Sequence, residues 1–141
     1  MLPVLLFGSE SWALKATDAQ SLERVHTQFL RQILNVRCVD RHRVEQIQAR
    51  CGTVSLSNHL MAHRLRWLGH VLRMGDERCL KQVLLSVLHG VKARPGNQLL
   101  SWEACVHQDL SVLGLPSGMQ ELKALCAQRS AWRSMLYKLT H

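Results

Sequence analysis

The sequence SNHLMAHRLRWLGHVLRMG, residues 57–75, separates into two faces on a helical wheel drawn at about 100° per residue. One broad arc is apolar and contains Leu60, Met61, Leu65, Trp67, Leu68, Val71 and Leu72. The opposite stripe is basic, and its members are His59, His63, Arg66, His70 and Arg73. Ser57 is a candidate N-cap, and Gly75 stands where such a helix would end. The stretch therefore predicts an amphipathic helix with one core face and one basic face.

The basic stripe contains no acidic residue, although an ordinary solvated helix face usually alternates both signs of charge. Like charges at helical spacing repel each other, so an anion is their natural counterpart, and a phosphate backbone is the commonest one. The three histidines of the stripe either contact phosphate or titrate as weak cations near a pH of about 6.5. A plain solvated surface and a docking surface for an acidic protein are the alternatives.

Arg64 differs from the other cations of this stretch because it points into the middle of the apolar arc. An unpaired charge in a protein core is very costly, so this side chain needs a partner or an exit. It pairs with a carboxylate from another helix, or its face meets a ligand, or its stem packs while the guanidinium reaches solvent.

The whole chain is basic, with a formal net charge of +8 and a pI of about 9.9, which favours polyanionic partners. Its 141 residues and 47% hydrophobic content are those of one globular domain. From Arg24 to Arg73 there are nine arginines, no lysine and only two acids. Arginine in place of lysine suits phosphate recognition, because its planar fork makes bidentate contacts.

The remaining sequence predicts a mainly α domain of about six to seven helices. Apolar residues recur at helical intervals behind capping residues, and we expect the further helices at about 18–35, 40–51, 76–90, 101–114, from 117, and 130–139. The segment from Leu2 to Phe7 is a short apolar run that predicts a single N-terminal strand. No second strand follows to pair with it, so the alternatives are irregular coil or a helical extension.

The sequence contains no recognisable catalytic centre. The only adjacent acids, Asp76 and Glu77, stand at a predicted helix start, where they serve as a cap and a dipole partner. No glycine-rich phosphate loop is present, and no pattern singles out a nucleophile. No stretch is long enough to span a membrane. We therefore expect a protein that is not an enzyme by itself, without a cofactor or a membrane partner.

A zinc site is the strongest metal hypothesis, and the sequence argues against it. Three histidines of the basic stripe lie on one helix face with Cys51 just upstream. Two arginines stand within the same stripe, however, and a dication beside them is unfavourable. The five cysteines have no zinc-knuckle spacing and predict reduced, mostly buried thiols of an intracellular protein. We expect no metal, and the sequence does not distinguish nucleus from cytoplasm.

Four segments resemble a known family. They are LLFGSESWAL at 5–14, LERVHTQFLRQIL at 22–34, RLRWLGHVLRM at 64–74 and QRSAWRSM at 128–135. In order and spacing they are similar to the C-terminal part of reverse transcriptases from non-LTR (LINE-type) retrotransposons. Phe7 stands where that family usually has tyrosine, and Gln128 where it has aspartate. The family's basic GRPRKRW segment is replaced by ARPGNQLLSW at 93–102.

The resemblance implies a division of the chain into the end of a polymerase palm, a thumb and a helical tail. Residues 1–16 would be the remnant of a palm strand, 17–90 a thumb-like helical domain, 91–98 a loop and 99–141 a helical C-terminal subdomain. The family's paired-aspartate polymerase motif and its endonuclease are absent from this sequence. The other partner that the resemblance implies is the rest of a polymerase in a parent protein.

The resemblance also implies a function, because thumb helices of the family would grip RNA or an RNA/DNA hybrid by its backbone. It assigns that role to arginines on the expected thumb, namely Arg31, Arg37, Arg41, Arg43, Arg66 and Arg73. A helical protein-interaction module and a decayed retrotransposon reading frame without a selected function are the alternatives.

Overall fold

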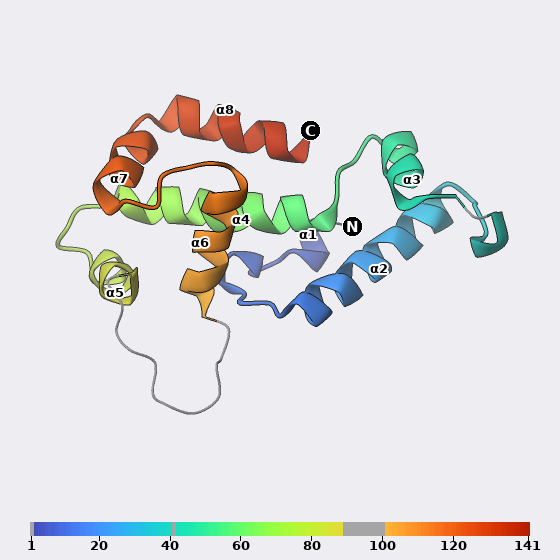
Figure 1. Ribbon diagram of the computed structural model, residues 1–141, viewed down its shortest axis with the longest axis horizontal. Helices are drawn as coiled ribbons and strands as arrows, with labels where there is room; N and C mark the ends of the chain where they lie inside the picture. Colours follow the sequence, from blue (N-terminus) through green and yellow to red (C-terminus); the bar gives the residue numbers. More distant parts are fainter. Residues whose placement is uncertain (1, 41, 89–100) are drawn as a thin grey trace.

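The computed structural model describes residues 2–40, 42–88 and 101–141. These residues form eight α-helices and no strand, so the predicted mainly α fold is confirmed (Figure 1). The helices are α1 (Leu2–Leu5), α2 (Ala16–Ile33), α3 (Val44–Cys51), α4 (Leu56–Leu72), α5 (Cys79–Leu88), α6 (Trp102–Val112), α7 (Met119–Ala127) and α8 (Arg129–Thr140). Two 3-10 turns, η1 (Ser9–Ser11) and η2 (Cys38–Asp40), precede α2 and α3.

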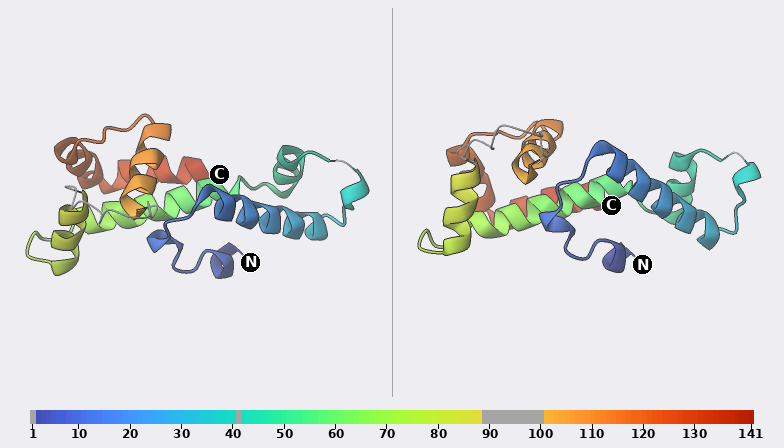
Figure 2. Two further views of the ribbon diagram at one scale, coloured as in Figure 1. Left: turned by 60° about the horizontal axis from the view of Figure 1, so that its bottom comes forward. Right: turned by 90° about the horizontal axis from the view of Figure 1, so that it is seen from below.

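Helix α4 is the central element, and it contacts α2, α5, α6, α7, α8 and η1. Figures 1 and 2 show the other helices arranged around it, with α2 and α3 towards one end and α5 and α7 towards the other. The helix begins slightly earlier than expected, because Ser55 is the N-cap and its hydroxyl accepts a hydrogen bond from the Asn58 N–H. Ser57 lies inside the helix.

The apolar arc of α4 forms the core, as its periodicity predicts. Leu65, Leu68 and Val71 are completely buried. They pack with residues of α5, α6, α7 and α8 in one cluster, whose members include Leu84, Val106, Leu110, Leu122, Cys126, Trp132 and Leu136. Helices from the two expected subdomains, 17–90 and 99–141, therefore share one hydrophobic core.

Helices α4 and α8 approach each other closely because α4 carries a glycine at the contact. A Cβ atom added at Gly69 would overlap Trp132 Nε1 and would lie 2.9 Å from Trp132 Cδ1. The indole N–H donates a hydrogen bond to the Leu65 carbonyl oxygen over 3.2 Å. Trp132 thus fixes α8 against α4 through both packing and a satisfied buried donor.

The N-terminal segment is helical, so the expected strand is wrong. Residues Leu2–Leu5 form α1, and the chain continues through a turn into η1. Leu6 is buried against Leu56 and Leu60 of α4, in a small second core cluster. A strand needs a partner to satisfy its backbone, and none is present among the described residues, so the segment makes its hydrogen bonds locally, as from the Leu6 N–H to the Leu2 carbonyl.

Several predicted helix starts shift for local reasons, while the start at Ser101 is confirmed. Ser101 accepts a hydrogen bond from the Ala104 N–H over 3.2 Å. Asp40 does not cap α3; it accepts a hydrogen bond from the N–H of Arg37, the residue just before η2, and α3 begins at Val44. The predicted loop at 91–98 and the predicted helix end at Gly90 lie outside the described residues. No described helix is long and apolar enough to cross a membrane.

Candidate functional site

The C-terminal half of the basic stripe of α4 is exposed and lies beside α8. Arg66, His70 and Arg73 are all solvent-exposed, at spacings of four and three residues. Helix α8 runs back along α4 in the opposite direction (Figure 1) and presents Arg129, Arg133 and Tyr137. The two rows line a common hollow of about 640 Å³, whose buried floor contains Trp132 and Leu136.

A second hollow of about 730 Å³ adjoins the first on the α8 side. It is lined by Arg129, Ser130, Arg133, Ser134 and Tyr137, so two arginines and the tyrosine border both hollows. We call the two hollows together the basic groove, defined by Arg66, His70, Arg73, Arg129, Arg133 and Tyr137.

The basic groove is electrostatically one-sided. Of the described residues that line the two hollows, four are arginines and none is acidic. Arg73 uses one N–H to donate a hydrogen bond to the Cys126 carbonyl oxygen over 3.0 Å, which leaves other guanidinium donors free to bind a ligand. Arginines on facing helices, in hollows without a described carboxylate, form a surface suited to an extended polyanion.

The other two members of the predicted stripe, His59 and His63, are half-buried and do not line the basic groove. His63 Nδ1 lies 3.2 Å from the hydroxyl oxygen of Ser9 in η1. Burial lowers the pKa of both imidazoles below the ordinary value; His26 lowers that of His59 further, and Arg66 that of His63. Both are therefore neutral near pH 7, and the stripe divides into a covered half and an exposed half.

Three further predicted arginines, Arg31, Arg37 and Arg43, belong to α2 and to the segment between α2 and α3, towards the other end of the molecule from α5 and α7 (Figure 2). Arg37 and Arg43 are exposed, whereas Arg31 is partly buried and donates a hydrogen bond to the His42 carbonyl oxygen over 3.4 Å. The hollow of about 570 Å³ at α2 contains Arg24 and Arg31 but also Glu23. Arg41 lies outside the described residues. Arg31, Arg37 and Arg43 do not line the basic groove.

Arg64 has the carboxylate partner that one of the three sequence alternatives required. Its Nε donates to Asp109 Oδ2 over 2.7 Å, and its Nη2 donates to Asp109 Oδ1 over 3.0 Å. Both residues are buried, with Asp109 supplied by α6. The bidentate pair is a structural link between α4 and α6, away from the basic groove.

The described residues also include an ion pair and a buried thiol outside the basic groove. No group of three or more histidine, cysteine, aspartate or glutamate side chains among them could hold a metal ion. Asp76, one of the two adjacent acids, pairs with Lys81 over 2.8 Å, and that hydrogen bond lowers the pKa of its carboxyl group. Burial raises the pKa of the Cys126 thiol to about 11, which makes it a poor nucleophile.

Sequence reasoning did not identify Arg129, Arg133 and Tyr137 as site residues. Their spacing of four residues is the same signal that identified the stripe on α4, and residues 129–141 contain no acid. These residues form a groove only together with α4, which lies far away in the sequence, so their spacing alone does not indicate a site. No protein-family model, curated protein or solved structure matches this chain.

Proposed function

We propose that the chain binds the phosphate backbone of RNA or of an RNA/DNA hybrid through the basic groove. One observation carries this proposal: arginines of α4 and arginines of α8 line the same hollow. None of the described residues that line the two hollows is acidic. Binding that neutralises phosphates with arginine releases counterions from the nucleic acid, so it depends steeply on salt. Such contacts hold the sugar–phosphate backbone and do not distinguish one base sequence from another.

The proposal includes the role that the sequence resemblance implies. A thumb-like fragment of a LINE-type reverse transcriptase would hold the template and product while chemistry takes place elsewhere. We therefore propose that the chain is not an enzyme by itself, and that its second partner is the rest of a polymerase. The facing arginines support the nucleic-acid role without depending on the resemblance.

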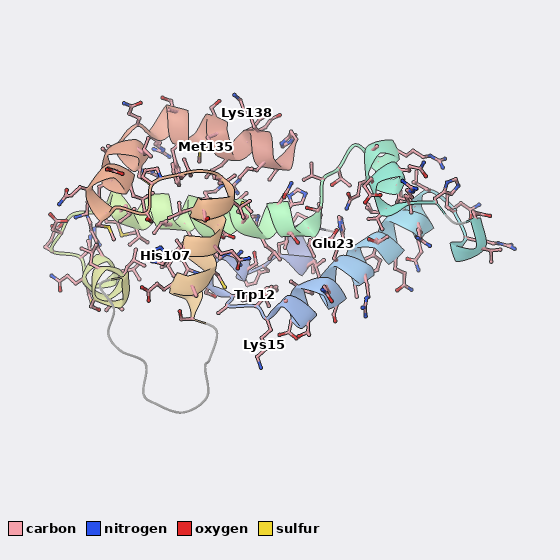
Figure 3. The ribbon with its side chains drawn as sticks, in the orientation of Figure 1. Trp12, Lys15, Glu23, His107, Met135 and Lys138 are labelled. Atoms are coloured by element: carbon pink, nitrogen blue, oxygen red, sulfur yellow. The ribbon has the colours of Figure 1, made fainter. Side chains whose placement is uncertain are left out.

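The test is a titration of a fluorescent RNA/DNA hybrid at several salt concentrations, with the wild type and two matched double variants. Arg66→Gln/Arg133→Gln removes one cation from each wall of the groove, and both side chains are exposed. Lys15→Gln/Arg50→Gln removes the same charge from exposed positions outside the groove; Lys15 extends from the start of α2 (Figure 3).

The groove variant should bind more weakly and should flatten the salt slope by about 0.7–0.9 for each lost phosphate contact. The control variant should keep most of the affinity and the wild-type slope. Equal effects of the two variants would show that only net charge matters, and would refute the groove as the site. A wild type that binds no hybrid even at low salt would refute the proposed function altogether.

A further inference from the structure

Tyr137 brings an exposed aromatic ring to the edge of the basic groove. It is 60% exposed, although a large aromatic ring favours burial. It borders both hollows and follows Arg129 and Arg133 along the same face of α8, at successive intervals of four residues. The ring therefore stands in line with the two arginines.

The ring already makes the kind of contact that a nucleic-acid base would make. The imidazole of His141 stacks on it with the ring centroids 3.9 Å apart and the planes inclined by 11°. A flat heterocycle of the same chain thus already lies against the ring of Tyr137. Stacking of bases on exposed aromatic rings beside a basic groove is how proteins commonly hold single-stranded nucleic acid.

A duplex could use the arginines but not the ring. The bases of a duplex are stacked on one another, so an aromatic side chain reaches a base face only where the strand is unpaired. The floor of the hollow is formed by Trp132 and Leu136, in the contact between α4 and α8. Arg129 and Arg133 are about 6 Å apart along the helix, so they can contact neighbouring phosphates of one strand.

We propose that the α8 side of the basic groove binds single-stranded nucleic acid, with one unpaired base stacked on Tyr137 and neighbouring phosphates on Arg129 and Arg133. This inference rests on the proposed function, because it assigns a strand state to the same groove. Tyr137 contributes to binding by stacking on a base, whereas Arg129 and Arg133 contribute by contacting phosphates of the backbone.

The experiment measures the affinity of three probes: a short unstructured RNA, an abasic strand of the same length, and a blunt-ended RNA/DNA hybrid. The variants are Tyr137→Leu, which keeps an apolar side chain but cannot stack, and Tyr137→Phe, which keeps the ring. Circular dichroism checks that α8 remains folded in each variant. Because the ring is exposed, neither variant removes core packing.

Tyr137→Leu should weaken binding of the unstructured RNA by about fivefold or more. The same variant should weaken binding of the abasic strand and of the hybrid by less than about twofold, and Tyr137→Phe should keep the wild-type affinity for RNA. Equal weakening of the RNA and the abasic strand would overturn the inference, because the ring would then act without a base.

The failure of this inference is distinguishable from the failure of the proposed function. If Arg66→Gln/Arg133→Gln weakens every probe while Tyr137→Leu weakens none, the groove binds backbone only and the stacking site is refuted. If the wild type binds none of the three probes at low salt, the proposed function and this inference are refuted together.

Discussion

The buried pair of Arg64 and Asp109 is the sharpest test of how α4 packs on α6, because its two members lie 45 residues apart in the sequence. The perturbation is a double-mutant cycle with Arg64→Met, Asp109→Leu and the combined variant. Each single substitution leaves one buried charge without its partner. The exposed fractions of the two residues are only 8% and 5%, so solvent cannot replace the lost contact.

Each single variant should therefore lose about 3–5 kcal/mol of unfolding free energy, the usual cost of breaking a buried ion pair from one side. For a chain of this size, that loss lowers the melting temperature by on the order of 10 °C. The double variant should lose far less than the sum, because an apolar pair of similar volume often replaces a buried ion pair without net cost.

The assay is denaturant unfolding of all four proteins, followed by circular dichroism. Arg66→Met on the same helix is the matched control; it removes an exposed arginine and should change stability by less than about 0.5 kcal/mol. Additive losses below about 1 kcal/mol in the single variants would refute the reasoning, because they would place the pair in solvent.

Two other predictions concern the close contact of α4 with α8 and the covered half of the stripe. Gly69→Ala should lower the melting temperature in a thermal scan even though alanine favours helices, because the added Cβ would displace Trp132 from its hydrogen bond to α4. The free energy of unfolding should also fall as the pH decreases through 6.5, the ordinary pKa of histidine. His59 and His63 have lowered pKa values in the folded state, so in this pH range they take up protons more readily in the unfolded chain. The loss should level off below the folded pKa values, and His59→Gln/His63→Gln should flatten this part of the pH dependence of the melting temperature; an unchanged slope would show that the two histidines do not cause it.

The helical fold was predictable because the decisive signal is local. The apolar period of residues 57–75 depends on consecutive residues only, and the side chains that it assigned to the core are buried or partly buried. The need of Arg64 for a partner was also predictable, from the cost of a buried charge. The identity of that partner was not, because Asp109 lies 45 residues away and nothing local marks it.

The strand expected from Leu2 to Phe7 was wrong, and the helical alternative holds for Leu2–Leu5, because a short apolar run carries no decisive period. Such a run becomes a strand only where another strand can pair with it, and that depends on the rest of the chain. In this fold Leu6 packs instead on Leu56 and Leu60, and the backbone forms local hydrogen bonds. Similarly, a wheel cannot show that Ser9 covers His63 while Arg66 stays exposed.

The start of α8 connects the local sequence preferences with the basic groove. Gln128 is the N-cap of α8, and its side chain makes no capping hydrogen bond. The first turn of α8 contains Arg129 and no acid, which opposes the helix dipole. Natural sequences depart from such local preferences mainly at functional sites. An anion bound in the groove would face both the arginines and the positive end of this helix, so binding would stabilise the segment that the sequence alone leaves weak.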